Sequence, residues 1–397
     1  MKIVADGNIP FIEACFSHLG EIHVVQGRQI TPARVADAEV LLVRSVTPVD
    51  RRLLENSRVR FVATATIGFE HVDVDYLRSR GIGFASAPGS NANSVAEYVV
   101  AALLAVGRRH HVTLQGKSIG IVGVGNVGSR VTAMCRALGM KTILHDPPLA
   151  RQTGDPAYRP LEEVLESDFV TLHTPLTQDG PDRTFHLADS AFFDRLRPGT
   201  VFINTSRGAV HDTQALKAAM AQGRLKAVVL DVWEDEPNVD QDLLRRVDLS
   251  TPHIAGYSLD GKIAGLMMVY LAVCRHLGIE HRHQAAEFLP VPAVPTIELE
   301  AEDLPEQELI HQTVQQVYAI HRDDFNTREI LVVRPQTRGA FFDDLRRNYP
   351  VRREFQNTTV LMEDSAGPLA RKLTGIGFLM SKINNQQSTT KNQEPTR

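Results

Sequence analysis

Three residues with complementary chemistry, Arg207, Glu236 and His253, each come shortly after a short apolar run that is typical of a buried strand. In open α/β sheets, ligands bind outside the carboxyl ends of the strands. Residues of these types at three strand ends therefore indicate one common site. Each residue also has an ordinary interpretation: a surface cation, one of the solvated acids at 234–236, and a structural loop histidine.

The chemistry that these side chains suit is the oxidation of a secondary alcohol. Histidine titrates near neutral pH, so His253 is suited to take the hydroxyl proton. Glu236 can orient the imidazole and stabilise its protonated form. Arg207 can bind the carboxylate of a 2-hydroxy acid through two parallel hydrogen bonds. The hydride also needs an acceptor, which a nicotinamide cofactor supplies.

A dinucleotide site is predicted from the pattern Gly123-x-Gly125-x-x-Gly128, which follows an apolar run and opens a helical pattern. Such glycines allow a tight turn, close approach to a pyrophosphate and close packing of the helix on the strand. Asp146 ends the next predicted strand, where a carboxylate can accept the ribose hydroxyls of NAD and repel the 2′-phosphate of NADP. We therefore predict NAD; a glycine turn with a helix-capping aspartate is the ordinary alternative.

Short apolar runs alternate with helical patterns in two series along the chain, an arrangement that predicts parallel sheets. We expect an α/β protein with two doubly wound parallel-sheet domains, Rossmann or flavodoxin-like, and a small C-terminal α+β domain. The predicted boundaries are 1–92 with 255–287 for a discontinuous substrate-binding domain, 93–254 for an NAD-binding Rossmann domain, 288–380 for a C-terminal domain and 381–397 for a disordered tail.

Composition excludes several kinds of partner. The net charge of −4 gives no basic field for nucleic acid. The longest apolar stretches, 98–107 and 265–274, are about half a membrane span, and the opening residues lack the apolar core of a secretory signal. Cys15, Cys135 and Cys274 lie far apart, so we expect a reducing cytoplasm, no disulfide framework and no metal site.

Six spaced segments resemble the D-2-hydroxyacid dehydrogenase family over about residues 1–285: ATIGFEHVD, VGVGNVG, LHTPLT, FINTSRG, LDVWEDEP and TPHIAGYS. The resemblance implies two domains facing a cleft, with Arg207, Glu236 and His253 as catalytic residues. It implies substrate contacts at Ser45, Thr66 and Tyr257. The cofactor contacts that it implies are Gly123, Gly125, Asn126, Val127, Gly128, Asp146, Thr174, Ser206, Arg207, Gly208, Asp231 and Gly256.

Within that family, the segments RSVT and IAGYSLDGK and a C-terminal region containing RREF resemble a branch whose members oxidise a phosphorylated 2-hydroxy acid in pyridoxal phosphate biosynthesis. Two alternatives stay open from the residues. One is another D-2-hydroxyacid dehydrogenase, of the phosphoglycerate or glycerate type. The other is an NAD-sensing binding protein that keeps the catalytic trio.

A substrate with a carboxylate and a phosphate needs two anion sites. Arg207 and the backbone N–H groups of ATIG, which ends at Gly68, account for the carboxylate. The phosphate candidates are Arg44, at a strand end, and a basic C-terminal segment. The arginines of that segment are Arg346, Arg347, Arg352 and Arg353. A solvated helix face balanced by Asp343 and Asp344 is the ordinary alternative for that segment.

A long helix is predicted from residue 94, because Ser94 and Glu97 form a capping-box pattern ahead of an apolar run. The family resemblance implies that this helix packs across the two-fold axis of a homodimer, with the C-terminal region as a dimerisation domain. The physical reason is that the helix carries more apolar residues than one core face requires; a fully buried helix between domains is the ordinary alternative, and the two are compatible.

Overall fold

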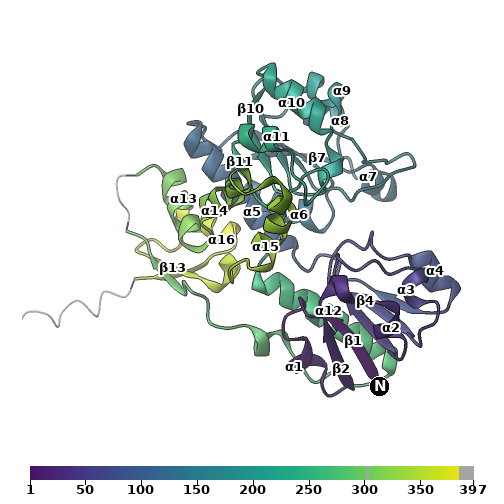
Figure 1. The fold of residues 1–397 in the computed structure, drawn as a ribbon. Helices are drawn as coiled ribbons and strands as arrows, with labels where there is room; N and C mark the ends of the chain where they lie inside the picture. The colour runs from purple at the N-terminus through teal and green to yellow at the C-terminus, as the bar shows by residue number, and fades with distance from the viewer. Residues whose placement is uncertain (301–303, 384–397) are drawn as a thin grey trace, which may run out of the picture.

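The computed structural model describes residues 1–300 and 304–383. Within these ranges the strands form three parallel sheets, one in each of three domains (Figure 1). The predicted fold class is confirmed. Of the predicted tail, residues 384–397 lie outside the described residues, whereas Ser381 and Lys382 belong to a strand.

The first domain holds a sheet in the order β2-β1-β3-β4-β5, which is the flavodoxin-like order. Helix α12 returns late in the chain to cover this sheet (Figure 1). Its elements are β1 (Lys2–Asp6), α1 (Ile12–Phe16), β2 (Glu21–Val25), α2 (Pro32–Val35), β3 (Val40–Val43), α3 (Arg51–Leu54), β4 (Phe61–Thr64), α4 (Val74–Ser79), β5 (Gly83–Ala85) and α12 (Leu259–Leu277).

Strand β2 and the short helix α2 are the strand and the α-helix of this domain that we did not predict. The strand pairs with β1 alone in the sheet order and forms the edge of the sheet. Only its last residue, Val25, is buried. An edge strand that is half exposed carries no continuous apolar run, so its sequence, EIHVV, gives a weak signal.

The central domain holds a sheet in the order β11-β10-β9-β8-β6-β7, and every strand in it was predicted. The chain order reverses on either side of β6, which places a crevice at the carboxyl ends of β6 and β8. Its elements are α5 (Ala92–Arg109), β6 (Ser118–Val122), α6 (Asn126–Ala137), β7 (Lys141–His145), α7 (Pro147–Thr153), α8 (Leu161–Leu165), β8 (Phe169–Leu172), α9 (Ser190–Arg195), β9 (Thr200–Asn204), α10 (Thr213–Ala221), β10 (Leu225–Leu230), α11 (Gln241–Arg246) and β11 (Leu249–Ser250).

The C-terminal domain packs on the central domain through a shared core (Figure 1). Its sheet has the order β12-β13-β14. Its strands and α-helices are β12 (Thr296–Glu298), α13 (Glu306–Val317), α14 (Ile320–Arg328), α15 (Arg338–Arg347), β13 (Thr359–Met362), α16 (Pro368–Gly375) and β14 (Leu379–Lys382).

Helix α5 corrects two expectations. It begins at Ala92, before the predicted capping box, and both Ser94 and Glu97 are buried side chains that bind the C-terminal domain. Its apolar surface is covered within the same chain, by α6, α13 and α14. The apolar excess of α5 is therefore no reason to expect a dimer. Among the described residues, no helix is both long and apolar enough to span a membrane.

Candidate active site

His253 and Glu236 form a hydrogen-bonded pair at the carboxyl edge of the central sheet. Nδ1 of His253 lies 2.7 Å from Oε2 of Glu236, and Oε1 of Glu236 accepts from the backbone N–H of Trp233 at 2.8 Å. Burial opposes the negative charge of Glu236, but His253, the Trp233 N–H and Arg346 outweigh it, so the pKa of Glu236 lies below its usual value. Glu236 is therefore an ionised partner that fixes the ring of His253.

Asp231 holds the loop that carries His253. Its carboxylate accepts from the Thr251 hydroxyl at 2.6 Å and from the N–H groups of Ile254 and Ala255 at 2.7 and 3.0 Å. Its carbonyl accepts from the N–H of His253 at 2.7 Å. These bonds hold His253 at a φ of 58°, a left-handed conformation that costs free energy outside glycine. The family resemblance implied a cofactor contact for Asp231 and gave no sign that Asp231 supports the His253 loop.

Arg207 lies against the ATIG loop of the first domain, as the carboxylate site requires. Its Nε donates to Oε1 of Glu70 at 3.2 Å, and its Nη1 donates to the carbonyl of Ser206 at 2.8 Å. A Cβ on Gly68 would overlap Nη2 of Arg207, so this glycine permits the close approach. Thr66 lies in the same loop, where its hydroxyl donates to the Gly68 carbonyl at 2.8 Å. Glu70 is a partner that sequence reasoning missed.

The glycine-rich loop fits a dinucleotide. A Cβ on Gly128 would overlap the carbonyl of Gly123, and Gly123 itself has a φ of 86°. A Cβ on Gly125 would meet no protein atom, so the loop is open where a pyrophosphate approaches. Helix α6 begins at Asn126, and the first N–H groups of a helix, here those of Asn126 and Val127, have no partner within the helix.

Asp146 performs the helix-capping role that we weighed against ribose binding. Its Oδ1 accepts from the N–H of Leu149 at 3.0 Å and so caps α7, and its Oδ2 accepts from the N–H of Val124 at 2.8 Å. The second bond ties the end of β7 to the glycine-rich loop. A carboxylate keeps further lone pairs for hydroxyl groups, so capping and ribose binding are compatible.

The remaining predicted cofactor residues divide into two kinds. The hydroxyl of Thr174 is buried without a protein partner, which fits a cofactor contact. Ser206 instead donates to Oδ1 of Asn204 at 2.8 Å. Packing requires glycine at both remaining positions. A Cβ on Gly208 would overlap the Trp233 carbonyl, and a Cβ on Gly256 would overlap the Asn91 side-chain amide.

A cluster of cations surrounds Tyr257. The charged ends of Arg44, Lys262 and Arg346 lie 5.9, 4.7 and 5.9 Å from the centre of its ring. Burial would raise the pKa of Tyr257, but these three charges outweigh it and lower that pKa. Burial and Arg44 together lower the pKa of Lys262. The cluster therefore concentrates positive charge that an anion would relieve.

The cation cluster lines a cavity of about 670 Å³ beyond the carboxyl ends of β1 and β3, next to Ser45. This is the point of the first sheet where the strand order reverses and where ligands bind in doubly wound sheets. Arg346 also helps to lower the pKa of Glu236, so the cation cluster acts electrostatically on the pair of Glu236 and His253. Lys262 is a second residue that sequence reasoning missed.

The four C-terminal arginines have different surroundings. Of the four, only Arg346 lies against Tyr257; Arg347 lines the same cavity, but it is exposed and pairs with Asp344 at 2.5 Å. Arg352 and Arg353 form buried ion pairs with Glu97 and Asp260 and are not part of the cation cluster.

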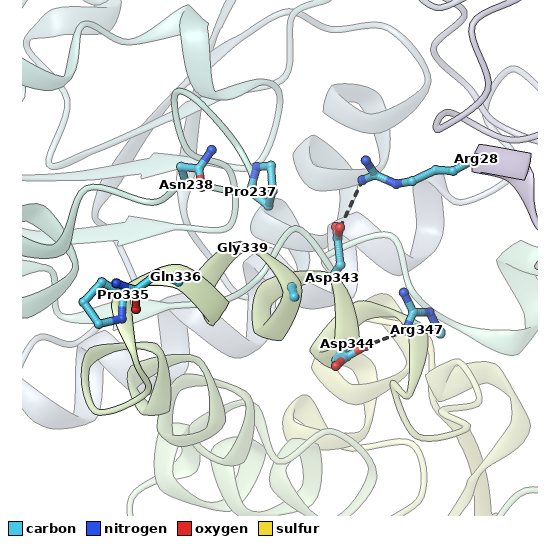
Figure 2. A pocket seen from close by; sticks show the side chains of 10 residues that line it. Arg28, Pro237, Asn238, Pro335, Gln336, Gly339, Asp343, Asp344 and Arg347 are labelled. Carbon is cyan, nitrogen blue, oxygen red and sulfur yellow. Dashed lines mark hydrogen bonds and ion pairs between the residues drawn. The ribbon is translucent and has the colours of Figure 1, made fainter.

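Helix α15 brings Arg346 to the site because it lies where all three domains meet. Figure 2 shows the neighbouring cavity of about 530 Å³, with Arg28 of the first domain reaching Asp343. Their charged atoms lie 3.0 Å apart. On the other side, Gly339 packs against Pro237 and Asn238 of the central domain, directly after Glu236.

Comparison with known families agrees with this geometry. Residues 96–255 match the model described as D-isomer specific 2-hydroxyacid dehydrogenase, NAD binding domain. Residues 288–377 match a model described as a domain of unknown function. The two matches correspond to the central and C-terminal domains seen in the structure.

Solved structures share the two large domains. A D-lactate dehydrogenase from Aquifex aeolicus, complexed with NAD and lactic acid, superimposes with a TM-score of 0.59 and 25% identity over 70% of this chain and 96% of that one. An NAD-dependent formate dehydrogenase from Staphylococcus aureus, in complex with NAD, shares the fold with a TM-score of 0.58 and 24% identity over 72% of this chain and 97% of that one.

Curated relatives extend over the C-terminal domain as well. An erythronate-4-phosphate dehydrogenase from Salinibacter ruber is 48% identical over 368 residues, which are 91% of this chain and 94% of that enzyme. One from Marinobacter nauticus is 46% identical over 381 residues, 95% and 99% of the two chains. The chain therefore belongs to the erythronate-4-phosphate dehydrogenases, a branch of the D-2-hydroxyacid dehydrogenase family.

Proposed function

We propose that the protein oxidises 4-phospho-D-erythronate to 3-hydroxy-2-oxo-4-phosphobutanoate with NAD, in pyridoxal phosphate biosynthesis. The observation that carries this proposal is the presence of two separate cationic sites next to one acid–base pair. Arg207 with the ATIG loop suits the carboxylate, and Arg44, Lys262 and Arg346 suit the phosphate. The family name of the relatives supports the same substrate.

In this mechanism NAD, when bound, accepts the hydride from C2 of the substrate. His253 takes the proton of the C2 hydroxyl on Nε2, since Nδ1 is occupied by Glu236. The carboxylate of Glu236 then stabilises the imidazolium. Arg207 holds the substrate carboxylate and polarises the oxygen that becomes the carbonyl.

The cofactor would lie along the carboxyl edge of the central sheet. The glycine-rich loop and the start of α6 would hold the pyrophosphate, and Asp146 the ribose of the adenosine. Thr174, with its unpartnered hydroxyl, would contact the cofactor nearby. Ser45 and Thr66 would contact the substrate from the first domain. Tyr257, which lies just before α12, would contact it as well.

We further infer a homodimer and a cytoplasmic location. Several exposed large apolar side chains belong to the C-terminal domain, and in a dimer they would be covered. They are Val291, Phe325, Val332, Val351 and Leu379. All three cysteines are buried and unpaired, which suits a reducing compartment. Light scattering at micromolar concentration tests the dimer, and a monomeric mass would contradict it.

The test of the reaction is the absorbance of reduced nicotinamide with a panel of 2-hydroxy acids, each with and without a terminal phosphate. We expect the highest kcat/KM with 4-phospho-D-erythronate and a large loss when the phosphate is absent. Preference for phosphoglycerate or glycerate would assign the chain another substrate. Binding of NAD without turnover of any acid would favour an NAD-sensing protein.

A further inference from the structure

The two places where the chain crosses between the first and central domains touch each other. One crossing leads into α5 and the other leads through the His253 loop into α12. The hydroxyl of Ser94, in the first turn of α5, lies 2.6 Å from that of Ser258, the N-cap of α12. Gly256 and Gly261 pack directly on Asn91 in the same place. Any change in the angle between the two domains must act on this contact.

One carboxylate from the C-terminal domain binds both crossings at once. Oε1 of Glu354 accepts from the Ser94 hydroxyl at 2.8 Å and from the Ser258 hydroxyl at 2.9 Å. Its other oxygen accepts from the Asn93 amide at 2.8 Å and the Gln356 amide at 3.1 Å. The residue is 3% exposed, so its charge depends on these partners.

The neighbours of Glu354 hold the same two helices separately. Arg352 donates to Glu97 of α5 at 2.5 Å, and the N–H of Phe355 donates to the other oxygen of Glu97 at 2.7 Å. Arg353 donates to both oxygens of Asp260 in the first turn of α12, at 2.9 and 3.0 Å. Both ion pairs are almost fully buried, where breaking one partner is far more disruptive than at the surface.

The structure assigns residues 352–355 (RREF) the role of a hinge clasp, with Glu354 as its positioning residue. The clasp sets the angle between the substrate-binding and NAD-binding domains and thereby the approach of substrate to cofactor. It acts on the second crossing, which carries both His253 and Tyr257. This role explains why a C-terminal domain accompanies the two catalytic domains within one chain.

If the clasp sets the angle between the domains, loss of Glu354 should lower kcat. The affinity for NAD should not change. Hydride transfer needs the two domains at one separation, and a misplacement of about 1 Å costs about 100-fold in rate. The glycine-rich loop, Asp146 and Thr174 lie within the central domain, and none of them contacts the clasp in the bonds described above. The kinetic part of this inference rests on the proposed reaction, but the geometric part does not.

The geometric test measures the distance between the two domains directly. Spin labels on Arg78→Cys in α4 and Gln222→Cys after α10 report on the first and central domains, and the three native cysteines are buried. In the full-length protein we expect a narrow distance distribution with Glu354 and a broader one in Glu354→Ala. An unchanged distribution in Glu354→Ala would overturn the clasp, whatever the substrate is.

The kinetic test compares Glu354→Ala, Glu354→Gln and Ser94→Ala with the control Glu363→Gln, an exposed carboxylate of the same domain. We expect kcat to fall about 10–100-fold in Glu354→Ala, with an NAD dissociation constant within about twofold of wild type. Glu354→Gln keeps one acceptor oxygen for the serines and should recover part of kcat. If Glu354→Ala does not fold, the same distances are measured in Ser94→Ala, which loses a single hydroxyl.

A double-mutant cycle separates the clasp from general loosening. Ser94→Ala and Glu354→Ala each remove one partner of the same hydrogen bond, so their combined effect on kcat should be smaller than the product of the two separate losses. Strictly multiplicative losses, or an equal rise in the NAD dissociation constant, would show that Glu354 only stabilises the fold.

Discussion

Arg207 and Glu70 meet across the boundary between two domains, with Nε of the arginine 3.2 Å from a carboxylate oxygen of the glutamate. Glu70 occupies one edge of the guanidinium, and Nη1 is turned to the Ser206 carbonyl. Nη2 lies close to Gly68 of the ATIG loop, the loop that we propose shares the substrate carboxylate with Arg207. Glu70 therefore holds the side chain of Arg207 from the opposite domain.

Glu70→Gln should lower kcat/KM by no more than about fivefold, because a half-exposed ion pair is worth about 0.2–1 kcal/mol. Arg207→Gln should be far more damaging, since it removes the carboxylate site itself. Steady-state kinetics of the two variants, with Glu70→Asp as the control that keeps the charge, measures the difference. A loss above about 100-fold in Glu70→Gln would give Glu70 a direct part in the chemistry.

His253→Ala should lower kcat by about 10²–10⁴-fold, the usual contribution of a general acid–base group. NAD binding should survive, because His253 is bonded to Glu236 and Asp231 and not to the glycine-rich loop. Turnover and quenching of protein fluorescence by NAD measure the two effects. Near-normal kcat would remove His253 from the acid–base role.

The sequence predicted the two large domains because buried parallel strands form continuous apolar runs. It also predicted that Arg207, Glu236 and His253 would share one edge of the sheet, and the strands that precede them, β9, β10 and β11, are neighbours.

The local pattern around Ser94 and Glu97 led to a wrong prediction, a capping box. A capping box and a ligand for a distant arginine use the same residue types, and only the packing of a segment some 260 residues away decides between them.

Lys262 and Glu70 could not be predicted for a related reason. Each lies on an exposed-looking turn or helix start, where charged residues are the ordinary occupants. Their roles depend on residues that are distant in the sequence: Lys262 lies near Arg44 of the same domain, beside Tyr257, and Glu70 faces Arg207 of the central domain. The angle between domains is set by tertiary contacts and leaves no periodic signal in the sequence.

His211 should make the protein lose stability on acidification. Burial lowers its pKa to about 4, and its Nδ1 accepts from the Asn204 amide, which also supports the carbonyl of Arg207. An unfolded histidine takes up a proton near pH 6.5, whereas the folded one stays neutral down to about 4. The contribution of His211 to the free energy of unfolding is therefore fully present above pH 6.5. It falls by as much as about 3 kcal/mol as the pH drops from 6.5 to 4.

Urea unfolding at several pH values between 7.5 and 4.5 (roughly the titration range of histidine) measures this slope. His211→Gln should give a flatter dependence than wild type, and His281→Gln, at an exposed position, is the control. Parallel curves for wild type and His211→Gln would contradict the neutral buried state of His211.

Asp146→Ser should narrow the preference for NAD over NADP by about tenfold, equivalent to about 1.4 kcal/mol. The change removes the charge that repels the 2′-phosphate. Serine keeps an oxygen for the Leu149 N–H, so α7 stays capped, although the bond from Val124 is lost. The ratio of kcat/KM for the two cofactors measures the effect. Equal use of both cofactors by wild type would contradict the role of Asp146.

The phosphate site needs a control arginine that lies outside the cavity. Arg346 lies against Tyr257, and Arg347, which pairs with Asp344, lines the same cavity and is therefore no control. Arg346→Ala should raise KM for the phosphorylated substrate at least about tenfold, since a charge-assisted bond to phosphate is worth about 1.5–3 kcal/mol. Arg322→Ala, at an exposed position of α14 that does not line this cavity, is the control and should change it little. Arg44→Ala and Lys262→Ala should behave like Arg346→Ala.

The comparison that decides the role of the cluster uses the same acid without its phosphate. If Arg44, Lys262 and Arg346 recognise the phosphate, their replacement should cost little with unphosphorylated erythronate, because wild type already lacks that contact there. Equal losses on both substrates would mean that the three cations act on the fold or on Glu236, which Arg346 also influences. An effect of Arg346 confined to phosphorylated substrate would make the C-terminal domain part of the substrate site, through a helix that the two catalytic domains alone do not contain.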